Sequence, residues 1–262
     1  QLSITPDGYL IGCGERESSG SNPYGGLFDF KFDLDGTMQW IKVSTDIRPV
    51  YCKAIIPVSA SEYVLSAVIA APSPPTYIDP IQLGVSALDG AALWTGPRYN
   101  YLSNGFNDDL VAGVLGNGLN TYVTGRTYVD GEEITSMRPF ISKYDPNSTI
   151  LWTKYYVTGP SAEARVYGSD IIYDSNSLTI CYFGDISQYT SNYQVGLIHT
   201  DTLGIFIWGK NYQITNFTSE QSFKVLKMPY GYAITGYGTG GGNDLFVVAV
   251  SDQGELIWAK AF

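Results

Sequence analysis

Two aspartates are the residues best placed in this sequence to carry out chemistry. Asp109 and Asp170 lie in segments that we expect to be the first strands of two successive repeats, with Asp108 and Glu220 at the approaches to such strands. A pair of carboxylates about 5–9 Å apart serves a glycosidase as acid and base, or as acid and nucleophile. Solvated loop acids explain the same residues, because no matching set of acids recurs along the chain. The pair therefore supports a carbohydrate-active enzyme as the alternative hypothesis.

Other catalytic signals are weaker. The sequence has one histidine, His199, so every Ser-His-Asp or Cys-His site would have to be built on it, and no nucleophile-elbow sequence accompanies it. Gly236, Gly238 and Gly241 match a dinucleotide-binding spacing, but the segment 243–250 that follows is typical of a strand instead of the helix that binds pyrophosphate. The sequence predicts neither a cofactor nor a metal site.

Three cysteines leave two interpretations open. Cys13, Cys52 and Cys181 fit one disulfide plus a buried thiol, but three buried thiols that act as small apolar residues are the favoured interpretation. Two N-x-T sequons, at Asn147 and Asn216, fall in predicted turns or loops where a glycan has room. These sequons favour a secreted protein.

The composition excludes several classes of function. Charged residues make up only 15% of the chain and the net charge is −10, so no basic stripe is present to bind nucleic acid. No apolar run reaches the length of a transmembrane helix. We find no signal peptide and interpret Gln1 as a mature or excised start. The predicted location is extracellular or at the cell surface.

An internal repeat organises the whole chain. The five tryptophans are spaced 54, 58, 56 and 50 residues apart, and four of them follow a glycine by four residues. The third has Ser148 in place of glycine, and Gly96 replaces the lysine found two residues after the other tryptophans. The tryptophans are Trp40, Trp94, Trp152, Trp208 and Trp258, and the glycines are Gly36, Gly90, Gly204 and Gly254.

Each repeat is readable as four short strands. The segments are rich in Val, Ile, Tyr, Phe and Thr, with Gly, Asn, Asp and Pro between them, which is typical of strands and tight turns. A period near 50 residues with four strands indicates the blades of a β-propeller. The sequence therefore predicts an all-β, five-bladed β-propeller of four antiparallel strands per blade. It forms one domain, 1–262, with blades at about 1–46, 47–103, 104–160, 161–215 and 216–262.

The repeat resembles two known families. Its Gly-x-x-x-Trp hairpin is similar to the tryptophan-docking motif of quinoprotein-type propellers. The phrases PDGYLIGCG and YGYAITGYG, followed by Asp-x-x-Gly and Trp-x-Lys, resemble the repeats of large secreted bacterial surface propellers. The resemblance covers nearly the whole chain at structural positions only. It implies the propeller ring and little about chemistry. The place of each tryptophan after the hairpin, on the expected outer strand of its repeat, predicts that it fastens one blade to the next.

These observations favour a non-enzymatic extracellular propeller. We expect a structural, assembly or binding module, such as the repeating subunit of a filament or surface layer, which associates with itself or with other surface proteins and glycans. The alternative is the glycosidase-like enzyme using Asp109 and Asp170. Quinone-dependent oxidation is a third hypothesis and rests on the scaffold alone.

Overall fold

The fold is all-β, as the sequence predicts. The computed structural model describes residues 2–16, 26–44, 49–70, 78–95, 109–116, 120–128, 137–147, 149–157, 165–185, 193–214, 217, 219–239 and 243–262. Strands β1 to β20 occupy these ranges, and no helix occurs within them. The same part of the chain therefore offers no helix able to cross a membrane.

The first two repeats each form a four-stranded antiparallel sheet whose strands neighbour each other in sequence order. The first sheet contains β1 (Leu2–Ile4), β2 (Leu10–Arg16), β3 (Gly26–Phe32) and β4 (Met38–Ser44). The second contains β5 (Pro49–Pro57), β6 (Glu62–Ala70), β7 (Ile78–Ser86) and β8 (Ala92–Thr95).

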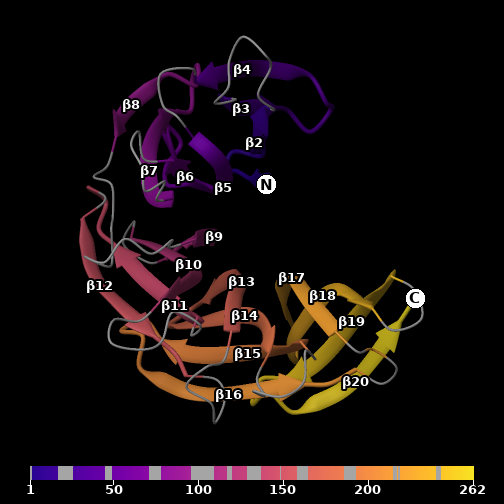
Figure 1. Ribbon diagram of the computed structural model, residues 1–262. Coiled ribbons are helices and arrows are strands. Elements are labelled where there is room, and N and C mark those ends of the chain that lie inside the picture. The colour runs from indigo at the N-terminus through magenta and orange to yellow at the C-terminus, as the bar shows by residue number, and fades with distance from the viewer. Residues whose placement is uncertain are drawn as a thin grey trace. The chain divides into compact units, whose positions relative to one another are not determined.

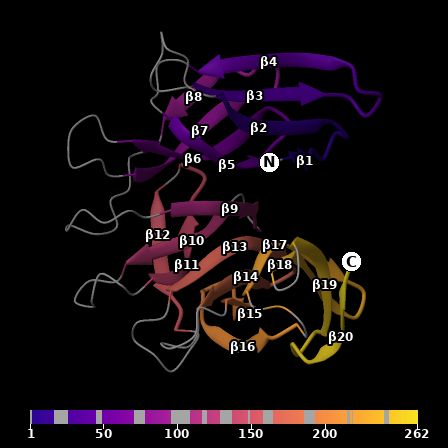
Figure 2. The same cartoon turned by 45° about the vertical axis from the view of Figure 1, so that its right-hand side comes forward.

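The third and fourth repeats keep this strand order, but a parallel bridge between Met137 and Arg165 joins them into one eight-stranded sheet. The fifth repeat is again a four-stranded sheet, and Figures 1 and 2 show that it is twisted. The third repeat contains β9 (Asp109–Leu115), β10 (Thr121–Tyr128), β11 (Met137–Tyr144) and β12 (Ile150–Tyr155). The fourth contains β13 (Arg165–Asp174), β14 (Ser177–Asp185), β15 (Tyr193–Asp201) and β16 (Phe206–Tyr212). The fifth contains β17 (Ser219–Met228), β18 (Gly231–Thr239), β19 (Asn243–Ser251) and β20 (Leu256–Ala261).

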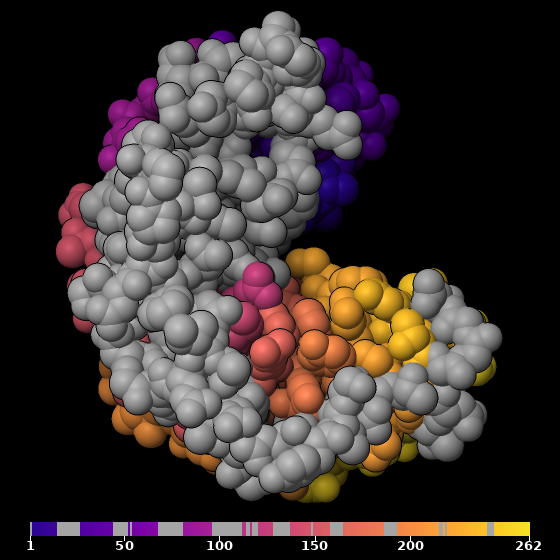
Figure 3. Space-filling view, viewed as in Figure 1, coloured from indigo at the N-terminus to yellow at the C-terminus, as the bar shows by residue number. Residues whose placement is uncertain are grey.

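The chain divides into two compact units. One consists of residues 1–121 and 143–151, and the other of residues 122–142 and 152–262. The single-domain assignment and the predicted blade boundaries stay a prediction. In the second unit the residues of the fourth and fifth repeats, orange to yellow, form a continuous surface (Figure 3).

Each unit has an apolar core between neighbouring sheets. In the first unit, Ile11 and Leu27 of the first repeat pack with Leu65 and Leu83 of the second. In the second unit, Leu197 of the fourth repeat packs with Ile234 and other residues of the fifth. The alternation of apolar and polar side chains along each strand directs these residues to the faces that meet.

The tryptophan of one repeat lies on the hairpin glycine of the next. Trp40 lies against Gly90, Trp152 against Gly204 and Trp208 against Gly254. A Cβ added to these glycines would lie 2.7, 2.9 and 2.6 Å from the indole rings. All three glycines have positive φ, between 70° and 77°. Only glycine therefore meets both demands of this position, since it tolerates the turn and leaves space for the ring.

A disulfide joins the first two repeats. Cys13 on β2 and Cys52 on β5 are bonded, with their Cα atoms 6.0 Å apart. Cys181 on β14 is a buried free thiol. The structure therefore contains one disulfide and one buried thiol, instead of three buried thiols.

Replacement of a docked glycine tests this packing rule. We expect Gly254→Ala to lower the free energy of unfolding by about 2–4 kcal/mol. The φ of +77° disfavours alanine and the new Cβ overlaps Trp208. Gly8→Ala is the matched control, because Gly8 has φ +84° and no atom within 4 Å of the added carbon, so it should cost only about 1 kcal/mol. Equal losses in chemical denaturation would contradict the docking.

Candidate functional site

Asp170, one of the predicted catalytic acids, joins the innermost strands of two repeats. It lies on β13 with 5% of its surface exposed. Its Oδ1 is 2.9 Å from Lys224 Nζ, and its Oδ2 accepts the backbone N–H of Val225 at 3.0 Å. Burial raises the pKa of this carboxyl, while Lys224 opposes the rise. Residues of β17 contact both carboxylate oxygens of Asp170. The side chain therefore has a packing role and does not face a substrate in the way that the alternative hypothesis requires.

The other predicted acid, Asp109, lies on β9, but its side chain is outside the described residues. Asp108 is also outside them.

Glu220 is a buried acid at the start of β17. It is 1% exposed, and its Oε1 accepts the N–H of Ile214 at 2.7 Å. Its Oε2 has no hydrogen-bond partner among the described residues. Burial raises the pKa of Glu220 to about 7. The side chain is enclosed by protein and does not reach a substrate.

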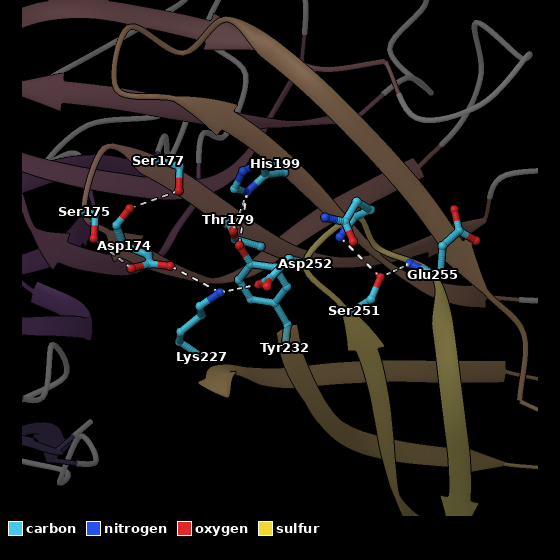
Figure 4. A network of polar contacts seen from close by, with 11 residues as sticks. Asp174, Ser175, Ser177, Thr179, His199, Lys227, Tyr232, Ser251, Asp252 and Glu255 are labelled. Carbon is cyan, nitrogen blue, oxygen red and sulfur yellow. Dashed lines mark hydrogen bonds and ion pairs between the residues drawn. The ribbon is translucent and has the colours of Figure 1, made fainter. Parts of the chain in front are cut away.

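His199 belongs to a packed network between the fourth and fifth repeats (Figure 4). Its ring stacks on Trp208 with centroids 5.1 Å apart, and its Nδ1 is 2.9 Å from Thr179 Oγ1. Burial lowers the pKa of His199. The nearby carboxylates of Asp174 and Asp252 are held by Lys227 instead. The network lacks the His-carboxylate contact of a catalytic triad and fits a packing role.

The sequence pattern of the tryptophan docks changes between the second and third repeats. The third hairpin carries Ser148 where the others carry glycine, and both Ser148 and Gly96 lie outside the described residues. The indole of Trp94 donates its N–H to the Glu62 carboxylate at 2.5 Å. By contrast, Trp40 donates its N–H to the Ala87 carbonyl of the next repeat at 3.3 Å. The ring at this seam is thus tied to its own repeat.

A cavity lies at this seam. Its volume is about 100 Å³, smaller than the roughly 300–1,000 Å³ of most small-molecule sites. Apolar side chains and two hydroxyls form part of its wall, and two carboxylates complete it. The lining residues are Val58, Ser59, Glu62, Val64, Thr121, Asp145 and Pro146.

Glu62 enters the cavity from the start of β6. The tight β5–β6 turn positions it, because the Glu62 carbonyl accepts the N–H groups of Val58 and Ser59, each at 3.1 Å. Its Oε1 is fixed by Trp94. Oε1 of Glu62 is therefore anchored by the indole of Trp94, and Oε2 takes no part in that hydrogen bond.

Asp145 enters from the hairpin that follows β11. Its Oδ1 accepts the N–H groups of Asn147 at 2.9 Å and Thr149 at 2.8 Å. The same turn recurs at Asp201, whose Oδ1 accepts Leu203 and Ile205 N–H groups. Oδ1 of Asp145 accepts both hydrogen bonds, and Oδ2 takes no part in them. The cavity thus contains two carboxylates whose positions are set by local backbone.

Thr121 is the buried hydroxyl of the wall. It is 3% exposed, and its Oγ1 lies 3.5 Å from the amide nitrogen of Gln82, which is also buried. A fixed hydroxyl of this kind suits recognition of a polar ligand.

The sequence contained a signal for this site that spacing alone did not reveal. Glu62 precedes Tyr63-Val64 where Gly8 and Gly231 precede the corresponding segments of two other repeats. The departures at Gly96 and Ser148 fall in the second and third repeats of the sequence, the two repeats that line the cavity. Positions where a repeat breaks its own pattern are where function is expected.

The remaining predicted sites are surface features. Asn147 is exposed at the tip of the β11–β12 hairpin, while Asn216 lies outside the described residues. Within the part of the chain that the structure describes, no three His, Cys, Asp or Glu side chains gather as metal ligands.

No protein-family model and no curated protein matches the sequence. Solved structures do match. A protein of unknown function from Dyadobacter fermentans aligns with TM-score 0.63 at 9% identity, over 97% of this chain and 78% of its own. A GH43 β-1,3-galactosidase with galactodeoxynojirimycin aligns with TM-score 0.53 at 10% identity, over 98% and 92%. Bacillus subtilis levansucrase aligns with TM-score 0.53 at 12% identity, over 100% and 84%.

These likenesses show a propeller-like fold, in agreement with the sequence. They correct the functional prediction. The non-enzymatic structural or assembly module, and with it the prediction that the protein is not an enzyme, is wrong, because the fold is shared with a galactosidase and a levansucrase. Positions that recur from repeat to repeat report how the sheets pack, and they carry no information about chemistry.

Buried Glu220 makes stability depend on pH. Its folded pKa of about 7 exceeds its ordinary 4.5, so its contribution is complete below pH 4.5 and is lost as the pH rises to about 7. Between pH 4.5 and 8 the unfolding free energy of the wild type should fall by up to about 3 kcal/mol more than that of Glu220→Gln. Glu255→Gln, which alters an exposed carboxylate paired with Lys210, should keep the wild-type slope. Parallel slopes for wild type and Glu220→Gln in urea titrations would contradict the assignment.

Proposed function

We propose that the protein is a carbohydrate-active enzyme that hydrolyses glycosidic bonds in the cavity of Glu62 and Asp145. One observation carries the proposal: two carboxylates from different repeats line one cavity, each anchored through a single oxygen. This arrangement leaves the second oxygen of each group for a ligand. Glycoside hydrolysis requires two carboxyl groups on opposite sides of the scissile bond.

The two carboxyl groups divide the chemistry between them. One, protonated, gives its proton to the leaving-group oxygen as the glycosidic bond breaks. The other, ionised, either removes a proton from the attacking water or attacks the sugar itself. Trp94 and the β11–β12 turn hold the two groups in place, which reduces the reorganisation needed in the transition state.

The cavity wall suits an uncharged sugar. Val58, Val64 and Pro146 offer apolar surface to the C–H faces of a pyranose, and Ser59 and Thr121 offer hydroxyls. Among the residues that the structure describes, none of those lining the cavity is Lys, Arg or His. An anionic sugar would therefore face two carboxylates without a counter-charge. The galactosidase and levansucrase that share the fold support a sugar as substrate.

The five-bladed form of the fold is part of the proposal. Trp258 of the last repeat is 49% exposed, and a Cβ at Gly36 in the first hairpin would meet no atom within 4 Å. Trp258 supplies the ring, and Gly36 the hairpin glycine, of one further tryptophan dock. The first sheet also carries an exposed apolar face, with Leu2, Ile4, Met38, Ile41 and Val43 each about half exposed or more. We infer that the last repeat docks on the first and closes a ring of five blades.

The location that we propose is extracellular, with glycans as partners. The Cys13–Cys52 disulfide is a bond that persists in oxidising compartments. Asn147 stands exposed on a turn, where a sequon is accessible to glycosylation.

Conservative substitutions of the two carboxylates test the catalytic assignment. Glu62→Gln and Asp145→Asn keep the oxygens that accept from Trp94 and from the turn, so both variants should fold normally. Each should lower kcat/KM at least about 100-fold, as loss of an acid or base does. The assay is release of 4-nitrophenol from a panel of neutral 4-nitrophenyl glycosides, with reducing-sugar release from polysaccharides.

Asp201→Asn is the matched control, because it alters the same turn in another repeat and should leave kcat/KM unchanged. Hydrolysis that survives in both cavity variants would place the active site elsewhere. No hydrolysis by the wild type of any glycoside or polysaccharide tested would contradict the proposed activity.

Truncation of the last tryptophan tests ring closure. If Trp258 docks on the first hairpin, Trp258→Ala should cost about 3–5 kcal/mol of unfolding free energy, the same as Trp208→Ala. Chemical denaturation of the two variants gives the comparison. A loss below about 0.5 kcal/mol for Trp258→Ala alone would show an exposed ring and an unclosed fold.

A further inference from the structure

The disulfide between the first two repeats has a buried acid beside it. Cys13 is 4% exposed on β2, and Cys52 on β5 is only partly buried. Asp29 on β3 stands directly opposite Cys13 in the antiparallel register. Opposite residues of such a pair lie on the same face with Cβ atoms about 4.5–5.5 Å apart. The Asp29 carboxyl therefore neighbours the sulfur of Cys13.

Asp29 is an unexplained group in the packing. It is 3% exposed, and its Oδ2 has no hydrogen-bond partner among the described residues. An unpartnered buried polar atom costs stability and calls for a functional explanation. The carboxyl is not used by the cavity of Glu62 and Asp145.

The charges around Asp29 leave its carboxyl protonated at mildly acidic pH. Lys42 stands opposite Asp29 on β4 and favours the ionised form, but burial outweighs it and raises the pKa to about 7. Lys31, two residues along the same face of β3, lies 4.0 Å above the Tyr9 ring and 3.8 Å from Asp7. The phenol of Tyr63 interacts with Lys31. Lys42 is thus the cation that acts on Asp29.

We propose that the Cys13–Cys52 bond is a reversible redox site, in which Asp29 supplies the proton that Cys13 takes up when a dithiol reduces the bond. A thiolate of the dithiol attacks Sγ of the more accessible Cys52, and the S–S bond breaks. Cys13 leaves as a thiolate and takes the proton of the Asp29 carboxyl. The second thiol of the dithiol then gives its proton to water and attacks the reagent's own sulfur in the mixed disulfide. This step closes the reagent into a cyclic disulfide and expels Cys52 as a thiolate, which takes a proton from water. Asp29 regains its proton from the solvent.

The order of attack follows from exposure. A small dithiol reaches the partly buried Cys52 before the nearly inaccessible Cys13. A leaving thiolate departs more readily when it is protonated, and a buried one has no water to protonate it. The proton must come from a neighbouring group, and Asp29 is opposite.

The test is the pH profile of reduction. The wild type is treated with dithiothreitol between pH 5 and 9, quenched with acid, alkylated after unfolding and weighed by mass spectrometry to count thiols. Each rate is divided by the thiolate fraction of the reagent. In the wild type this normalised rate should fall about tenfold as the pH rises through 7, because Asp29 loses its proton and its charge then opposes the leaving thiolate.

Asp29→Asn should abolish that fall, with a slower normalised rate than wild type below pH 7 and an equal or faster one above pH 8. Lys42→Met should move the midpoint of the fall to higher pH, and it keeps the test available if Asp29→Asn does not fold. Glu220→Gln, which alters a comparable buried acid away from the disulfide, should keep the wild-type profile. A normalised rate in Asp29→Asn that parallels wild type would overturn the proposal. So would a wild-type rate independent of pH, or a purified protein with no Cys13–Cys52 bond.

Discussion

The contact between an indole ring and the hairpin glycine of the next repeat is the constraint on which the structure depends. It fixes where each outer strand must lie, because the ring needs a glycine that both turns the chain and leaves space. The apolar cores of the two units are assembled behind these contacts. Each buried ring removes up to about 150–250 Å² from water, on the order of 4 kcal/mol or more. A repeat that loses its glycine must therefore find another arrangement for the ring.

The third hairpin carries Ser148 in place of that glycine in the sequence, and the cavity lies between the second and third repeats. Here the indole of Trp94 donates its N–H to Glu62, one of the two acids that line the cavity with Asp145. The site combines two carboxylates, apolar walls and a buried hydroxyl. The buried acids Asp170 and Glu220 lie between packed sheets, and they show that burial of a carboxylate does not by itself make an active site.

Local patterns in the sequence predicted the strands, the glycine hairpins and the fastening role of the tryptophans, since each depends on residues close in the chain. The catalytic candidates were not predictable in the same way. Glu62 and Asp145 become neighbours only when two repeats pack, and Asp145 looks like an ordinary turn residue because Asp201 makes the same turn. The pairing of Cys13 with Cys52 likewise depends on which inner strands meet. Asp170 does lie on an inner strand, but a lysine of the next repeat pairs with its carboxylate, and the sequence gives no sign of that contact.

The central claim is that the cavity between the second and third repeats binds a sugar between its two carboxylates. A crystal structure of the protein with an iminosugar such as galactodeoxynojirimycin tests it most directly, because the ring nitrogen seeks a carboxylate. The account predicts the ring in the cavity, with polar atoms within hydrogen-bond distance of Glu62 and Asp145. An empty cavity at saturating iminosugar, or a ring bound only at another place, would contradict it.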